Sequence, residues 1–393
     1  MPTPADILFR ANALRDRLVE ARRSIHAHPE LGLTTPRTQQ VIIEELERIG
    51  LGPIVRGREC TSVVVDIDGG AKSVRSDACV LLRADMDALP LVELSGEPFA
   101  STVDGCMHAC GHDAHVAMLL GAAAILHDVR GEFGGRVRLV FQPGEEGYGG
   151  ARLMIDEGML DGVASAFAIH VDPSRPVHLV AGRAGTMLAA FDNFEVVFRG
   201  AGGHASTPHA TRDPIPAIGP FVDALSHVAA RETDPNDRVV FSVTCVRAGT
   251  ADNVIPSAAT CVGTIRSLSP RGRERARERL RRVADGVALM RGLQAEVTLE
   301  EGYPPTINAA AVLARITECA AELGLESYEM PAPFMGAEDF SYVLERVPGA
   351  MVFLGCGSDG SGPLHSDLMR IDEDVLPTGA ALHVAAALRM LRA

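Results

Sequence analysis

The sequence lacks the features that mark several common protein classes. It has no apolar run approaching the roughly 20 residues that a membrane helix needs, and its first residues show no basic region followed by an apolar segment. We therefore expect neither a membrane span nor a secretory signal. The formal net charge of −14 argues against nucleic-acid binding, which requires a basic surface. The eight cysteines are scattered, which favours reduced thiols in a cytoplasmic protein over a disulfide framework.

The length and the pattern of apolar residues predict two domains. A chain of 393 residues exceeds the roughly 250–300 residues at which one core stops growing. Helical and strand patterns alternate over residues 1–186 and 303–393, which predicts an α/β domain with a mostly parallel mixed sheet and helices on both faces. The expected helices cover residues 4–27, 35–49, 113–127 and 150–157. The expected strands cover residues 61–66, 79–84, 136–141, 164–169 and 351–354.

Residues 187–302 follow a different order. Strand patterns at residues 191–199, 238–246, 259–267 and 295–300 are interleaved with helical patterns at residues 215–231 and 270–290. The order β-α-β-β-α-β is that of a ferredoxin-like antiparallel sheet with two helices. We therefore expect an inserted α+β domain over residues 187–302.

Residues of the types that bind metals follow several of the predicted strands. Asp85 and Asp87 follow one strand, Glu145 and Glu146 another, His170 a third, and His365 lies in a loop after the apolar run 351–354. Open α/β sheets build their sites at the carboxyl ends of strands. The segment 107–115 (MHACGHDAH) adds Cys110 and His112 with two further histidines, and together these groups predict a divalent metal centre.

The residue types suggest roles but leave alternatives open. Of the adjacent pair Glu145 and Glu146, one would bind metal and the other would act as general base, although a solvated acidic turn has the same composition. Asp85 or Asp87 could orient a ligating histidine, or simply end a strand. In the inserted domain, His204 on a glycine-rich loop could stabilise an oxyanion, or be a solvent-exposed histidine.

Eight motifs in one order make the chain resemble a known family. They are HAHPE (26–30), RADMDALP (83–90), residues 107–115, QPGEE (142–146), GGH (202–204), NVIP (253–256), GAEDF (336–340) and PLH (363–365). In these motifs the chain resembles the M20 peptidases, specifically the aminoacylase-like amidohydrolases. That branch includes hippurate hydrolases, N-acyl-amino-acid deacylases and hydrolases of auxin conjugates.

The resemblance implies a role for each residue. Glu145 would be the general base, Asp87 a supporting carboxylate and His204 an oxyanion-stabilising group reaching its own or the partner's site. Asn253 and Arg266 would hold the substrate carboxylate. The inserted domain would close over the substrate and form a homodimer. The ligands of two divalent ions, Zn²⁺, Mn²⁺ or Co²⁺, would be Cys110, His112, Glu146, His170 and His365, with Cys110 bridging.

The predicted function is hydrolysis of the amide bond of an N-acyl-L-amino acid or related conjugate by metal-activated water. A dipeptidase or carboxypeptidase on the same scaffold is the close alternative. Two more distant alternatives are a cysteine hydrolase, with Cys110 as nucleophile and His112 as base, and a non-catalytic metal-binding protein.

Overall fold

The chain forms two compact units, each with its own hydrophobic core. The computed structural model describes residues 1–71 and 77–392. The first unit contains Met1–Met187, Ile307–Ala332 and Asp339–Ala393. The second contains Leu188–Thr306 and also the short segment Pro333–Glu338. Two short strands, β7 (Gly185–Leu188) and β14 (Thr306–Asn308), lie where the chain passes from one unit to the other.

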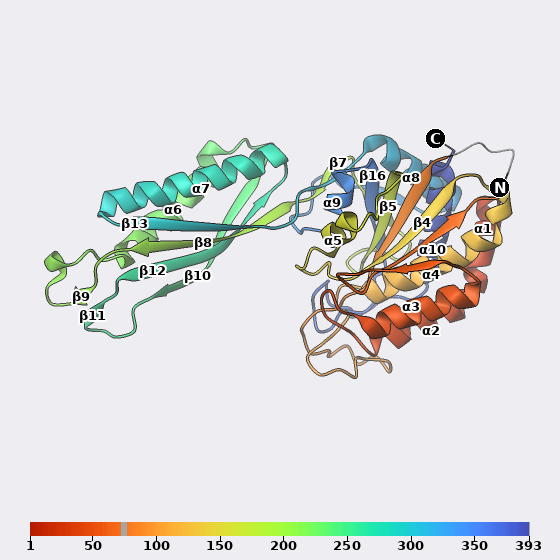
Figure 1. The fold of residues 1–393 in the computed structure, drawn as a ribbon, viewed down its shortest axis with the longest axis horizontal. Coiled ribbons are helices and arrows are strands. Elements are labelled where there is room, and N and C mark those ends of the chain that lie inside the picture. Colours follow the sequence, from red (N-terminus) through yellow and green to blue (C-terminus); the bar gives the residue numbers. More distant parts are fainter. Residues whose placement is uncertain (72–76, 393) are drawn as a thin grey trace. The chain divides into compact units, whose positions relative to one another are not determined.

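The first unit is built around an eight-stranded sheet (Figure 1). In spatial order its strands are β1 (Ile54–Arg56), β2 (Val63–Asp68), β4 (Arg136–Gln142), β3 (Cys79–Asp85), β5 (Val163–Asp172), β16 (Gly349–Gly355), β6 (Val180–Gly182) and β15 (Ser327–Glu329). The central strands β4, β3, β5 and β16 are mutually parallel. Antiparallel pairing occurs toward the edges, between β1, β2 and β4 and between β16 and β6. The predicted mostly parallel mixed sheet is confirmed.

Helices cover the sheet. They are α1 (Pro4–Ala13), α2 (Arg15–His26), α3 (Pro36–Ile49), α4 (His112–Asp128), α5 (Gly150–Asp156), α8 (Ala310–Glu322), α9 (Ser341–Leu344) and α10 (Val375–Met390). Helices α4 and α10 pack against each other and the sheet, with α1, α2, α3 and α8 around them. Figure 1 shows α5 and α9 on the other side of the strands. Helix α4 is buried along nearly its whole length, because it lies between the sheet and an outer layer of helices.

The single helix predicted over residues 4–27 is two helices. Helix α1 begins at a capping box, in which the Thr3 side chain accepts from the Asp6 N–H and the Asp6 carboxylate accepts from the Thr3 N–H. The chain leaves regular helical geometry at Leu14, and α2 then runs on to His26. Periodicity did not show the break, because Leu14 has an apolar side chain that fits either helix.

The second unit is an antiparallel sheet with two helices. Its strands pair in the order β10 (Val239–Ala248), β12 (Ala258–Ser267), β8 (Ala190–Arg199) and β13 (Gln294–Glu301). Helices α6 (Ile218–His227) and α7 (Pro270–Arg291) pack together and bury apolar side chains against it. Strands β9 (Gly203–His204) and β11 (Val254–Ile255) form a separate short ladder at one end (Figure 1).

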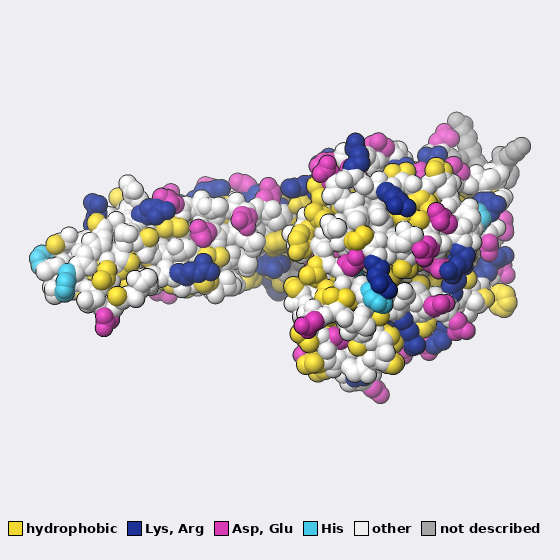
Figure 2. Space-filling model, turned by 60° about the horizontal axis from the view of Figure 1, so that its bottom comes forward, with side chains coloured by type: hydrophobic (Ala, Val, Ile, Leu, Met, Phe, Trp, Pro, Cys, Tyr) yellow, Lys and Arg dark blue, Asp and Glu magenta, His cyan; other side chains and the backbone are white. Residues whose placement is uncertain are grey.

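The structure also shows the distribution of surface charge, the apolar length of the helices and the state of the cysteines. Figure 2 shows acidic and arginine side chains interspersed over the visible face of each unit. Among the described residues, no helix is long and apolar enough to cross a bilayer. All eight cysteines are free thiols, and seven of them are buried.

Candidate metal centre

The predicted ligands meet at one edge of the large sheet. Parallel strands present their carboxyl ends at the same edge, so the segments after β3 and β4 and the end of β5 lie close together. His170 lies within the last residues of β5 rather than after it. Cys110 precedes α4, and His112 is its first residue. His365 is brought in by a hydrogen bond from its N–H to the carbonyl of Ala109, at 2.8 Å.

The ligand atoms form overlapping groups. Those of Cys110, His112 and His170 lie within 4.8 Å of one another, and so do those of Cys110, Glu146 and His365. Cys110 Sγ is 3.4 Å from His170 Nε2, and Glu146 Oε1 is 3.4 Å from His365 Nε2 and 3.9 Å from His112 Nε2. The two groups share Cys110, so its sulfur would be a ligand in both groups if each held an ion.

Hydrogen bonds aim the ligands into the cluster. His112 Nδ1 bonds the backbone oxygen of Asp87 at 2.8 Å, so its Nε2 is the nitrogen that faces the other ligands. His170 Nδ1 likewise donates to the Val171 carbonyl at 2.7 Å. His112 Nε2 and Glu146 Oε1 are buried, and each lacks a hydrogen-bond partner among the described residues. Buried polar atoms seldom lack partners, and sulfur, imidazole and carboxylate donors suit first-row transition metals, so these residues fit divalent ions.

The backbone at two ligands is unusual. Gly111, between Cys110 and His112, has φ of +85°, and a Cβ there would lie 2.3 Å from Val171 Cγ2. Both the conformation and the space require glycine. His365 has φ of +65°, which is rare for a residue with a side chain and is typical of functional sites.

The Asp87 carboxylate lies beside a proposed ligand, with Oδ1 3.6 Å from His112 Nδ1, and it also holds the loop that carries the two glutamates. Its Oδ1 accepts from the N–H of Glu145 at 2.9 Å, and its Oδ2 accepts from the N–H of Glu146 at 3.1 Å. The contact with His112 at hydrogen-bond distance comes from the Asp87 backbone oxygen. Asp87 therefore fixes the loop that carries both glutamates, and Glu145 lies within 4.8 Å of His112 and Glu146.

The electrostatics of the cluster favour the binding of cations. Burial, together with Glu146 and Glu145, raises the pKa of the Cys110 thiol well above its ordinary value. Burial alone would lower the pKa of His112, but Asp85 and Asp87 raise it to about 10. In the absence of metal the cluster therefore keeps these protons, and bound cations would replace them by stabilising the thiolate and the neutral imidazole.

The other two histidines of the 107–115 segment have different surroundings. His115 Nδ1 bonds Asp85 at 2.5 Å, and its Nε2 accepts from the Val171 N–H at 2.9 Å, so both nitrogens already have protein partners. His108 is fully buried, and burial lowers its pKa to about 3. His115 therefore lies within 4.8 Å of His112 and Asp85 but has both nitrogens engaged, and His108 belongs to none of the ligand groups found among the described residues.

Two residues beneath the centre were missed by sequence reasoning. Arg83 donates to Asp85, to Gln142 at 3.0 Å and to Asp339 at 2.9 Å, and all of these side chains are buried. Asp339 also accepts from Gln142 Nε2 and from the Ala151 N–H. Arg83 and Asp339 do occur in the RADMDALP and GAEDF motifs, but the contact between them joins positions 256 residues apart.

A buried histidine between two carboxylates predicts a pH effect on stability. His26 Nδ1 is 2.8 Å from Asp113 and its Nε2 is 3.1 Å from Glu93, so both nitrogens face carboxylates and must donate. Burial, and to a smaller extent Arg22, opposes the charge, but Asp113 and Glu93 outweigh them and raise the pKa of His26 to about 9. His108, whose ring centre lies 6.2 Å from that of His26, has its pKa lowered to about 3 by burial and stays neutral.

We expect the stability that His26 contributes to be fully present below its ordinary pKa of about 6.5 and to be lost as pH rises through about 9. The shift corresponds to a contribution on the order of 3 kcal/mol. Thermal unfolding of the wild type and of His26→Gln at pH 6.5 and 9.5 should show the difference between them shrinking at the higher pH. A constant difference would contradict a charged His26.

The predicted residues of the second unit do not all lie together. His204 pairs with Val254 in the β9–β11 ladder, and Asn253 O accepts from the Ala205 N–H, so His204 and Asn253 are neighbours. His204 is exposed, and its Nδ1 accepts from the Ser206 N–H at 3.1 Å. Asn253 precedes the first residue of β12, whereas Arg266 lies near the last residue of that strand. Arg266 is half-buried, and its guanidinium is 5.2 Å from the centre of the Phe191 ring.

The separation can be estimated from the register of β8 with β12. Arg266 pairs with Phe191 and Ala258 pairs with Arg199. These pairs are eight residues apart, or about 26 Å at ~3.3 Å per residue, and His204 lies beyond Arg199. One substrate carboxylate cannot contact Arg266 and the His204–Asn253 end of the same chain.

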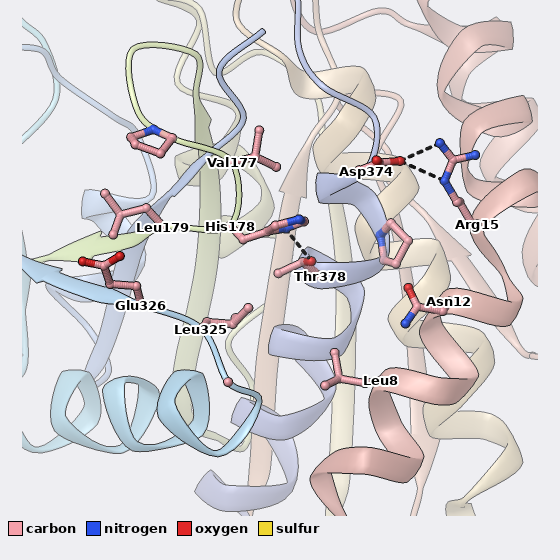
Figure 3. A pocket seen from close by; sticks show the side chains of 13 residues that line it. Leu8, Asn12, Arg15, Val177, His178, Leu179, Leu325, Glu326, Asp374 and Thr378 are labelled. Carbon is pink, nitrogen blue, oxygen red and sulfur yellow. Dashed lines mark hydrogen bonds and ion pairs between the residues drawn. The ribbon is translucent and has the colours of Figure 1, made fainter.

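A cavity of about 520 Å³ lies elsewhere in the first unit (Figure 3). It is bounded by α1, the start of α2, the loop after β5 and the start of α10. Arg15 bonds Asp374 at 2.6 Å and Thr378 bonds His178 at 2.9 Å, as Figure 3 shows. None of the predicted site residues lines it, so it takes no part in the metal centre.

Comparisons with known proteins agree with this geometry. The model of peptidase family M20/M25/M40 matches residues 81–389. The "Thermostable carboxypeptidase 2" of Saccharolobus solfataricus is 39% identical over 382 residues, covering 96% of each chain. The "IAA-amino acid hydrolase ILR1-like 2" of Arabidopsis thaliana is 41% identical over 387 residues, covering 96% of this chain and 86% of the relative.

A solved structure is similar over the whole chain. The crystal structure of a Bacillus subtilis protein, described as a dinuclear metal-binding peptidase of the M20 family, has a TM-score of 0.85 and 34% identity. It covers 97% of this chain and 99% of that one. These matches confirm the family predicted from the motifs and support a two-metal centre. The chain belongs to peptidase family M20/M25/M40 and is a metal-dependent amidohydrolase of that family.

Proposed function

We propose that this enzyme hydrolyses the amide bond of N-acyl-L-amino acids or related amino-acid conjugates, releasing an acid and an amino acid. The observation that carries the proposal is the convergence of five ligand side chains in overlapping groups, with a further buried carboxylate, Glu145, within 4.8 Å of His112 and Glu146. The resemblance to a protein named as an IAA-amino acid hydrolase supports an acylated amino acid as the substrate.

The proposed ligands of two divalent ions are Cys110, His112, Glu146, His170 and His365. When bound, such ions supply Lewis acidity, which polarises the amide carbonyl and makes water a stronger acid. The matched family structure supports a two-metal centre, and Zn²⁺, Mn²⁺ and Co²⁺ all suit the donor set.

Glu145 is the proposed general base. It is buried and lies beside the ligand Glu146, while the hydrogen bond from its N–H to Asp87 fixes its backbone. The carboxylate accepts a proton from the attacking water and then delivers it to the leaving nitrogen, which must depart as a neutral amine. Asp87 acts through the backbone of this loop rather than on the substrate.

The proposed roles in the second unit require two chains. His204 would stabilise the oxyanion that forms during attack, and Asn253 and Arg266 would bind the substrate carboxylate. Because Arg266 and the His204–Asn253 pair lie at opposite ends of one sheet, we propose a homodimer in which His204 and Asn253 complete the partner's site. We also propose a cytoplasmic location, consistent with eight free thiols.

A carboxypeptidase is the second candidate, favoured by the 39% identity with a protein of that name. Both candidates cleave an amide beside a free carboxylate and differ in the group on the acyl side. A cysteine hydrolase is disfavoured, because the Cys110 thiol is buried with a raised pKa and lies among four other side chains of metal-ligand type.

A substrate panel distinguishes the two candidates. The metal-loaded enzyme is assayed on N-acetyl, N-benzoyl and indoleacetyl amino acids and on dipeptides and N-blocked peptides with matched C-terminal residues. We expect kcat/KM to be highest for an N-acyl amino acid. Preference for peptides by more than tenfold would replace the proposal with the carboxypeptidase, and absence of turnover on every amide would refute both.

A further inference from the structure

The hydrogen bonds of His115 determine which ring nitrogen carries its proton. The backbone N–H of Val171 can only donate, so His115 Nε2 must be unprotonated to accept this bond at 2.9 Å. The proton then resides on Nδ1 and is donated to the Asp85 carboxylate. Asp85, His112 and His115 lie close enough to hold an ion, but His115 is held in one neutral tautomer with both nitrogens engaged, so we do not assign it as a ligand.

His115 meets β5 where the pairing of that strand with β3 stops. The β3–β5 register ends at Arg83 with Ala168, although β3 continues to Asp85. Beyond that point His115, from the first turn of α4, accepts the N–H of Val171. The carbonyl of the same Val171 accepts from His170 Nδ1 at 2.7 Å. A short path of hydrogen bonds thus runs from His115 through the Val171 backbone to the His170 imidazole.

The Asp85 carboxylate, which accepts a hydrogen bond from His115, is itself held by further hydrogen bonds. Asp85 accepts from Arg83, and Arg83 donates to Asp339, which also accepts from Gln142. All five side chains are at most 2% exposed. Because a fully hydrogen-bonded buried network resists movement, it fixes α4 relative to strands β3, β4 and β5.

We infer that His115 is a positioning residue that sets the separation between His170 on β5 and the ligands Cys110 and His112 at the start of α4. These three ligands come from elements with no direct backbone pairing, yet their ligand atoms lie within 4.8 Å of one another. The inference rests on the proposed ligand set, but not on the identity of the substrate. Its consequence is that the network controls affinity for the ion between Cys110, His112 and His170.

The test is a titration of the metal-free protein with Co²⁺ in competition with a chelator. His115→Leu removes both hydrogen bonds, and His115→Gln retains a donor and an acceptor. We expect His115→Leu to weaken one of two Co²⁺ sites by about 10–100-fold, the usual effect of removing a group that orients a ligand. It should also perturb the thiolate-to-Co²⁺ absorption band of Cys110. His115→Gln should remain within a few-fold of the wild type.

His383→Leu is the matched control. His383 is also a fully buried histidine with a lowered pKa, but it lies on α10 with its ring edge-on to Phe167. It should lose stability without losing Co²⁺ affinity. An equal loss of affinity in His383→Leu, or in His115→Gln and His115→Leu alike, would overturn the inference, because packing alone would then explain the effect.

His115→Asn provides the test if His115→Leu does not fold. Its shorter side chain retains a donor for Asp85 but has no acceptor where Nε2 receives the Val171 N–H, so we expect a weakened site here too. Wild-type Co²⁺ affinity and absorption band in a folded His115→Asn or His115→Leu would overturn the inference. The titration contains no substrate, so failure of the proposed amide hydrolysis would leave this result standing, and the reverse also holds.

Discussion

Glu145→Gln is expected to lower kcat by about 10²–10⁴-fold, the usual contribution of a general base. Glutamine has nearly the same shape but cannot accept the proton from water. Asp87 would still bind the backbone N–H of residue 145, so the loop should keep its conformation. Measurements of kcat and of bound metal per chain on the same preparation test this, and metal content should stay at the wild-type value.

The neighbouring variant Glu146→Gln is the matched control. It alters the same loop by the same change, but at the carboxylate that faces His365 and His112. We expect it to lose metal as well as activity. If Glu145→Gln retained wild-type turnover on every hydrolysed amide, or lost metal as Glu146→Gln does, the assignment of the base would be wrong.

Cys110→Ala is expected to abolish activity together with metal binding. The thiolate belongs to both ligand groups, so its loss weakens both ions. Activity should be undetectable at metal concentrations that saturate the wild type, and elemental analysis should find less than one ion per chain. Dialysis of the wild type against a chelator should abolish activity in the same way, and added Zn²⁺, Mn²⁺ or Co²⁺ should restore it.

A cysteine hydrolase would behave differently in both experiments. Its activity would survive the chelator, and an alkylating reagent would inactivate it at Cys110 regardless of metal. For the metalloenzyme, bound ions should protect the thiol, because a coordinated and buried sulfur reacts slowly. Turnover that persists in the presence of the chelator would therefore show that the reaction does not depend on metal.

The sequence was sufficient to predict the architecture and the neighbourhood of the ligands. Strand β3 ends in Asp85 and strand β4 is followed by Glu145 and Glu146, and parallel strands place those ends at one edge. The short strands β6 and β15 were missed, because three residues carry too little periodicity. Helix α10 was missed because it is buried nearly all round and lacks a polar face.

The individual roles of the site residues could not be predicted from the residue types alone. His112 and His115 are both histidines on one turn of α4, and only their partners distinguish a nitrogen facing other ligands from one bonded to a backbone N–H. The role of Asp87 likewise depends on two amides 58 and 59 residues away. Arg266 and His204 were both predicted to act on one bound substrate, but the strand register shows that they lie far apart in the same chain.

The two ligand groups differ in their accessibility to solvent, and this has a consequence for metal loading. Cys110, His112 and His170 are all buried, whereas His365, in the other group, is 55% exposed on a loop with an uncommon backbone conformation. An ion held by the buried group can leave only if the surrounding protein opens, but one held by His365 can exchange directly with solvent. Purified enzyme would then retain the ion of the buried group and exchange the other ion for metal from the buffer. The same polypeptide would therefore show different metal preferences after different purifications.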